Sequence, residues 1–183
     1  MPYAKNPAWL ELIQLVPVVS LALPFIVTGD VDLSRAGGGL LVAALLTLPV
    51  TGLVLWQRGV LNPILVGTAV WLWVGAVAFN LPVEGVRTAL VEAQGFGLFA
   101  SVFAVGIVST LASAAGFIGC RHPDAGLVRR ASLVLLGLAT VALAWSWSFR
   151  HNIRLGGGLP FIVLNVVRRV LIQRKMPPPS VVS

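Results

Sequence analysis

"GFGLFASVFAVGIVSTLASAAGFIG", residues 95–119, is a run of 25 residues without a charged side chain. A helix that crosses a lipid bilayer needs about 20 mostly apolar residues. The apolar residues are continuous and do not alternate with polar ones, which favours a helix over a strand of a membrane barrel. We therefore expect this segment to span a membrane as a helix.

The composition extends this interpretation to the whole chain. The 183 residues are 57% hydrophobic and 10% charged, whereas a typical soluble domain is about 25% charged. The mean hydropathy of +0.94 requires apolar segments along the full length. We mark six such segments, at about 10–28, 40–56, 64–79, 96–118, 133–149 and 155–172.

The expected fold class is therefore all-α, a polytopic integral membrane bundle of six transmembrane helices. Residues 1–175 form this single domain, and residues 176–183 are a Pro-rich cytoplasmic tail. The first segment is expected to stay as a helix, because no small-residue cleavage site of a signal peptide follows it. The sixth is short, because only 155–167 is free of charge; Arg168 and Arg169 would have to snorkel to the interface.

The positions of Lys and Arg predict the orientation. With the N-terminus inside, nine basic residues lie on the inner side and four on the outer side, as the positive-inside rule requires. If the sixth segment did not cross, five basic residues would lie inside and eight outside, against the positive-inside rule. The charges therefore favour a crossing and place both termini inside. Arg outnumbers Lys by 11 to 2 and small apolar residues abound, which is typical of a GC-rich bacterial genome. The predicted location is the bacterial inner membrane, with multiple passes.

Several functional classes are disfavoured by the same counts. The net charge of +7 lies in short loops between apolar segments, where it sets topology, so no nucleic-acid partner is expected. The single cysteine, Cys120, excludes an intrachain disulfide. No Cys/His framework for a metal is present, and neither a metal nor another cofactor is expected.

A short motif, Arg-x-Gly-Gly-Gly-Leu, occurs twice. In the predicted topology each copy lies on the outer side, at the N-terminus of a helix that runs inward. Free N–H groups and partial positive charge at such an end favour an anion, such as a lipid phosphate or a carboxylate. The alternative is that the glycines only turn the chain or let helices touch. The candidate ligand-binding residues are Arg35, Gly37, Gly38, Gly39, Arg154, Gly156, Gly157 and Gly158.

Two further groups are candidate ligand-binding residues. Asp30, Asp32 and His151 belong to a cluster of acidic and basic residues in the predicted outer loops. This cluster would bind a ligand or exchange protons; the alternative is a solvated surface with scattered ion pairs. Trp71 and Trp73 lie at the middle of the third segment, about 200° apart around a helix. One of them is expected to face the bundle and line an apolar cavity, with plain packing as the alternative.

One acidic residue is a weaker candidate. Glu11 lies near the start of the first segment, where an ionisable group is either functional or simply interfacial.

Small residues recur at i, i+4 spacing along the fourth segment. The pairs are Ala100 and Ala104, Ser109 and Ser113, and Ala112 and Gly116. Such pairs let helix backbones approach closely. The fourth segment is therefore expected to be the packing centre, and a surface for other membrane subunits or a second copy.

These observations favour a small-molecule transport or ligand-binding membrane subunit, with outer-face contacts to anions or lipid headgroups. One alternative is a non-catalytic partner or assembly factor of a larger membrane complex. Another is a membrane enzyme that acts on a lipid or isoprenoid. No catalytic residue is nominated, so a non-enzymatic role is favoured. Membrane lipids are the expected partners.

Overall fold

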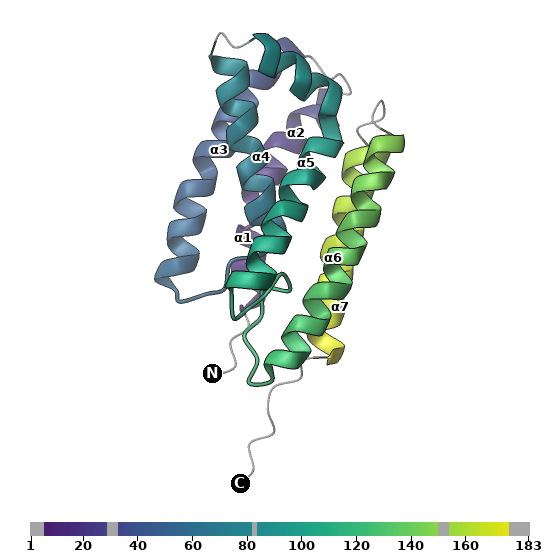
Figure 1. Cartoon of the computed structure of the whole chain (residues 1–183). Helices are drawn as coiled ribbons and strands as arrows, with labels where there is room; N and C mark the ends of the chain where they lie inside the picture. The colour runs from purple at the N-terminus through teal and green to yellow at the C-terminus, as the bar shows by residue number, and fades with distance from the viewer. Residues whose placement is uncertain (1–5, 29–32, 82–83, 150–153, 176–183) are drawn as a thin grey trace.

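The computed structural model describes residues 6–28, 33–81, 84–149 and 154–175. Within these ranges the chain is an all-α bundle without strands, as the sequence predicts (Figure 1). Five of its helices are long and apolar enough to cross a membrane. They are α3 (Leu33–Trp56), α4 (Pro63–Asn80), α5 (Glu84–Ala112), α6 (Ala125–Ser148) and α7 (Leu159–Lys175). The fifth, α7, reaches this length together with the short π-helix η1 (Arg154–Gly158), which precedes it.

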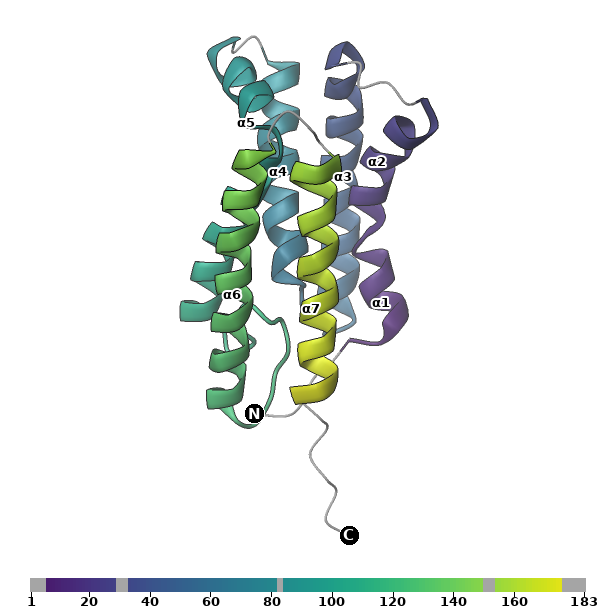
Figure 2. The same cartoon turned by 90° about the vertical axis from the view of Figure 1, so that its right-hand side faces the viewer.

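The first apolar segment differs from the expected continuous helix. It forms α1 (Ala8–Ile13) and α2 (Val16–Thr28), which follow one another beside α3 (Figure 2). The break lies just before Pro17, which has no N–H to donate to the carbonyl of Ile13 and whose ring crowds the preceding turn. A helix of either length is too short to span a bilayer by itself.

The described chain begins and ends at the same end of the bundle. In Figure 2, α1 and the C-terminal part of α7 lie at one end. Asn6 is hydrogen-bonded to Val60 in the α3–α4 connection, and Arg168 of α7 to Gly119 in the α5–α6 connection. We call this end the inner end and the opposite one the outer end. The arrangement fits termini on one side of a membrane, while the assignment of that side to the cytoplasm stays a prediction.

α5 is central to the packing, as expected from its small residues. It packs against α4, α6 and η1. The contact between the α4 and α5 backbones does not use the predicted pairs, since Ala104 and Ala112 are exposed. It uses Gly67 of α4, where an added Cβ would lie 2.5 Å from the Cα of Val102. Glycine therefore brings these two backbones together.

The fourth segment ends earlier than predicted. The helix stops at Ala112, and the chain folds back in a connection at the inner end, of which residues 115–120 are buried. Gly116 and Gly119 have φ angles of 57° and 64°, a left-handed conformation that side chains with a Cβ rarely adopt. Phe117 and Ile118 are completely buried among α5, α6 and α7.

Candidate functional site

The first glycine triplet lies inside a helix. α3 begins at Leu33, so Gly37–Gly39 fall beyond the first four residues, whose N–H groups lack a helical partner. The carbonyl of Gly37 accepts a hydrogen bond from the Asn80 side chain at 3.1 Å, and an added Cβ there would lie 3.3 Å from Cβ of Phe79. Gly37 therefore seats α3 against the end of α4, whereas an added Cβ at Gly38 would meet no atom within 4 Å.

The second triplet has different neighbours. It forms η1 ahead of α7 and packs against α5 and α6. An added Cβ at Gly156 would lie 2.6 Å from the carbonyl oxygen of Phe149, and one at Gly95 would lie 2.9 Å from the carbonyl oxygen of Gly156. One glycine of each copy, Gly37 and Gly156, thus packs closely against a neighbouring segment, at two separate places.

The charged part of the outer cluster is not described. Asp30, Asp32 and His151 lie outside the described residues, as do the side chains of Arg35 and Arg154. The anion site at the outer end therefore stays a prediction.

Both central tryptophans contact neighbouring helices. The Trp71 ring packs directly against Gly97 of α5, and the Trp73 Nε1 donates a hydrogen bond to the Thr47 Oγ1 of α3 at 3.1 Å. They face different helices, as their spacing predicts. Neither lines the pocket described next.

A pocket of about 110 Å³ lies where the broken first segment meets α3 and α4; we call it the α1–α4 pocket. Its lining contains no ionisable side chain. Gln14, Thr47, Thr51 and Asn62 supply the polar side chains. The remaining lining residues are apolar: Pro17, Val18, Val50, Leu61, Leu65, Val66, Ala69 and Leu72.

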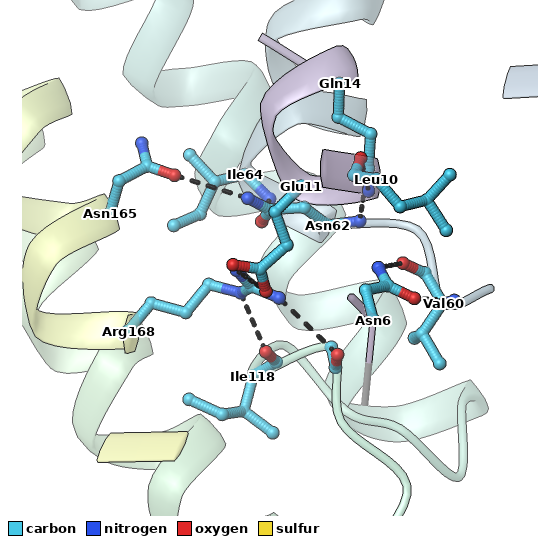
Figure 3. A network of polar contacts seen from close by, with 11 residues as sticks. Asn6, Leu10, Glu11, Gln14, Val60, Asn62, Ile64, Ile118, Asn165 and Arg168 are labelled. Atoms are coloured by element: carbon cyan, nitrogen blue, oxygen red, sulfur yellow. Dashed lines mark hydrogen bonds and ion pairs between the residues drawn. The ribbon is translucent and has the colours of Figure 1, made fainter. Parts of the chain in front are cut away.

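Asn62 joins the pocket to three elements (Figure 3). Its side-chain oxygen caps α4 by accepting a hydrogen bond from the Ile64 N–H at 3.1 Å, and its Nδ2 donates to the Asn165 Oδ1 of α7 at 3.2 Å. Its backbone N–H donates to the Gln14 Oε1 at 2.8 Å. Because Gln14 also donates to the Leu10 carbonyl at 3.2 Å, these polar groups are bonded within the protein.

Arg168 lies beside this network and contradicts the expected snorkelling. It is 3% exposed and turns inward from α7 (Figure 3). Its Nε donates to the Ile118 carbonyl at 2.8 Å, its Nη2 to the Gly119 carbonyl at 3.5 Å, and its Nη1 lies 3.7 Å from the Glu11 Oε1. The carbonyl oxygens of this buried connection lie outside any helix and need hydrogen-bond donors. The charged guanidinium of Arg168 is a strong donor to them, so the side chain turns inward and does not reach for the interface. Arg169, by contrast, is exposed.

The sequence-based candidates missed most of this inner-end network. Gln14, Asn62, Asn165 and Arg168 were not among them, although an arginine inside an apolar segment is a signal in itself. The Asn62–Pro63 pair predicts a turn, and the structure makes it a helix cap. No group of three or more His, Cys, Asp or Glu residues that could hold a metal ion occurs in the described ranges. Comparison of the chain with protein-family models, curated proteins and solved structures finds no match.

Proposed function

We propose that this multi-pass membrane protein is a small-molecule transport or ligand-binding subunit, and that the α1–α4 pocket is its binding site. The observation that carries the proposal is a pocket at the break between α1 and α2, in the first apolar segment. Discontinuous helices beside a binding site are common in transporters. The proposed location is the bacterial inner membrane.

The pocket favours a small, uncharged and mainly apolar ligand. A dry apolar cavity of about 150 Å³ holds benzene, so about 110 Å³ suits a molecule of that size or slightly smaller. A charge would be buried without a counter-ion in the lining, at a high cost in desolvation. Gln14 and Thr47 already have protein partners, which leaves apolar contact as the main source of affinity.

Fluorobenzene, which is larger than benzene by the exchange of one hydrogen for fluorine, provides a probe close to this size. We expect saturable binding to the protein in lipid nanodiscs, measured by ¹⁹F NMR against empty nanodiscs. Ala69→Leu adds carbons to the pocket wall and should abolish the binding. Ala104→Leu makes the same change on an exposed face of α5 and should retain it. Equal binding by the two variants, or no saturable binding by the wild type, would contradict the proposal.

A role as a non-catalytic partner is the second candidate. An apolar groove of about 170 Å³ lies between α6 and α7. Its lining residues are Leu138, Val141, Ala142, Trp145, Leu159, Pro160, Val163 and Leu164. A second chain that stays bound in stoichiometric amount, and is lost on Ala142→Leu, would favour this role over ligand binding.

The outer-end contacts remain part of the proposal. Binding of a lipid phosphate or carboxylate near Arg35 and Arg154 is tested by replacing both with Gln. If the folded double variant retains as much anionic lipid as the wild type in native mass spectrometry, the proposed anion contact at the outer end is wrong. A membrane enzyme acting on a lipid or isoprenoid would depend on the outer Asp and His residues, and no observation on the described residues favours it.

A further inference from the structure

Thr51 lies on the inward face of α3. Residues three, four or seven positions apart lie on the same side of a helix. Ala44, Thr47 and Val54 stand at these spacings from Thr51, and all three are buried. Thr51 itself is only half-buried and lines the α1–α4 pocket. The part of its side chain that neighbouring residues leave uncovered therefore adjoins the pocket.

Thr51 differs from the other polar residues of the pocket in its hydrogen bonding. Gln14 and Asn62 both donate and accept hydrogen bonds within the protein. The Thr47 hydroxyl donates to a carbonyl of its own helix at 2.6 Å and accepts from the Trp73 Nε1 at 3.1 Å. Within the described residues, no hydrogen bond is found for the Thr51 hydroxyl. Thr51 therefore supplies an uncommitted hydrogen-bonding group to a lining whose other polar groups are occupied.

The pairing of Thr47 with Trp73 indicates which chemical group suits Thr51. A threonine hydroxyl has one O–H donor and two lone pairs that accept. Thr47 uses its O–H on its own helix and accepts an N–H from an aromatic side chain. Thr51 lies one turn further along the same face, where its O–H can reach a backbone carbonyl in the preceding turn. The lone pairs that remain are complemented by an uncharged O–H or N–H donor.

We propose that the Thr51 hydroxyl determines the ligand specificity of the α1–α4 pocket. The ligand is then a small uncharged molecule with an apolar body and one O–H or N–H donor, the class that phenol represents. This inference rests on the proposed function of the pocket. The apolar walls bind the body of such a ligand, and Thr51 accepts its donor. A ligand hydroxyl that enters an apolar pocket without a partner loses its hydrogen bonds to water, so Thr51 decides whether such a ligand is accepted.

Phenol and fluorobenzene form a matched pair of probes, because they have the same number of non-hydrogen atoms and only phenol carries a hydroxyl. Thr51→Val removes the hydroxyl of the protein and keeps the shape of the side chain. We expect this variant to bind phenol about fivefold more weakly, the factor that one hydrogen bond usually contributes, and to bind fluorobenzene as the wild type does. Saturation-transfer difference NMR on the protein in nanodiscs of deuterated lipid, against empty nanodiscs, measures each probe separately.

Two control variants separate the hydroxyl from other effects of substitution. Thr51→Ser keeps the hydroxyl and loses the methyl group, so the ratio of the two affinities should stay close to that of the wild type. Thr140→Val makes the same change as Thr51→Val on an exposed face of α6, where the hydroxyl donates to the Leu136 carbonyl at 3.1 Å. It should change the binding of neither probe.

Thermal unfolding tests the same assignment without a ligand. Thr51→Val should be at least as stable as the wild type, because no hydrogen bond within the protein is lost. Thr47→Val should be less stable, because it removes the bonds to the Ala44 carbonyl and to Trp73. A clear loss of stability in Thr51→Val would reveal a protein partner for its hydroxyl and overturn the proposal.

The binding outcomes distinguish this inference from the proposed function. If Thr51→Val leaves phenol binding unchanged, or weakens both probes equally, the role of the hydroxyl is wrong while the pocket remains a binding site. If the wild type binds phenol but not fluorobenzene, and Thr51→Val loses phenol, the role of the hydroxyl stands and apolar contact is not the main source of affinity. If neither probe binds the wild type saturably, the proposed function fails, and the ligand class fails with it.

Discussion

Gly67 provides the sharpest test of the packing between α4 and α5. An added Cβ would lie 2.5 Å from the Cα, 2.9 Å from the N and 3.0 Å from the Cγ2 of Val102. Carbon atoms pack best at about 3.5–4.0 Å, so Gly67→Ala must push the two backbones apart by about 1 Å. The contact is with backbone atoms, which cannot move away as the end of a flexible side chain can.

The expected loss in the free energy of unfolding is about 1–3 kcal/mol, the usual cost of overpacking. Separation of α4 from α5 would also weaken the hydrogen bond that the Ser101 hydroxyl donates to the Gly67 carbonyl, which is 2.8 Å long. The gain from replacing a helical glycine, about 0.5–1 kcal/mol, offsets only part of this cost. Gly67→Ala should therefore be clearly less stable than the wild type.

Gly52→Ala is the matched control. Gly52 lies in α3, is exposed, and an added Cβ there would meet no atom within 4 Å, so this variant should equal or exceed the wild type in stability. Thermal unfolding in detergent can be followed with a thiol-reactive dye, because Cys120 is the only cysteine and is buried. A Gly67→Ala variant as stable as Gly52→Ala would refute the close approach of α4 and α5.

Three further substitutions test other contacts by the same unfolding measurement. Gly156→Ala should destabilise the protein by about 1–3 kcal/mol, whereas Gly158→Ala, with open space around its Cβ, should be tolerated; equal losses would contradict the packing described for η1. Ser146 has a buried hydroxyl without a hydrogen-bond partner in the described structure, so Ser146→Ala should keep or raise stability, and a clear loss would reveal a missing partner. Trp73→Phe removes the hydrogen bond to Thr47 and should cost about 0.6 kcal/mol; no change would mean that this bond contributes nothing to α3–α4 packing.

The helices themselves were largely predictable. A spanning helix must satisfy its backbone hydrogen bonds internally and present apolar side chains to lipid, so hydropathy alone locates α4 closely and most of α3, α6 and α7. α3 and α6 begin at Leu33 and Ala125, well before the predicted starts at 40 and 133. The sixth segment, which looked too short, continues past its two arginines to Lys175. It can do so because Arg168 is satisfied within the bundle.

Hydropathy failed where the chain stops being helical while it stays apolar. Residues 113–120 are as apolar as a helix, but two glycines there adopt left-handed angles and the connection folds inward. The break before Pro17 is a similar case, because proline disrupts the hydrogen-bond pattern without lowering the hydropathy. Both departures border the inner-end network.

The sequence by itself determined the class of this protein, most of its helices and the gathering of its positive charge at one end, because these depend on composition and on local hydrogen bonding. The tertiary structure decided what the polar residues do. Glu11, Asn62 and Arg168 are far apart in the chain, and each reads locally as a helix end or an interfacial charge. Only packing brings them to one place, because a buried polar group takes whichever partner the fold presents. The pocket likewise exists only between elements, where Gln14 at the end of α1 meets α2, α3 and α4.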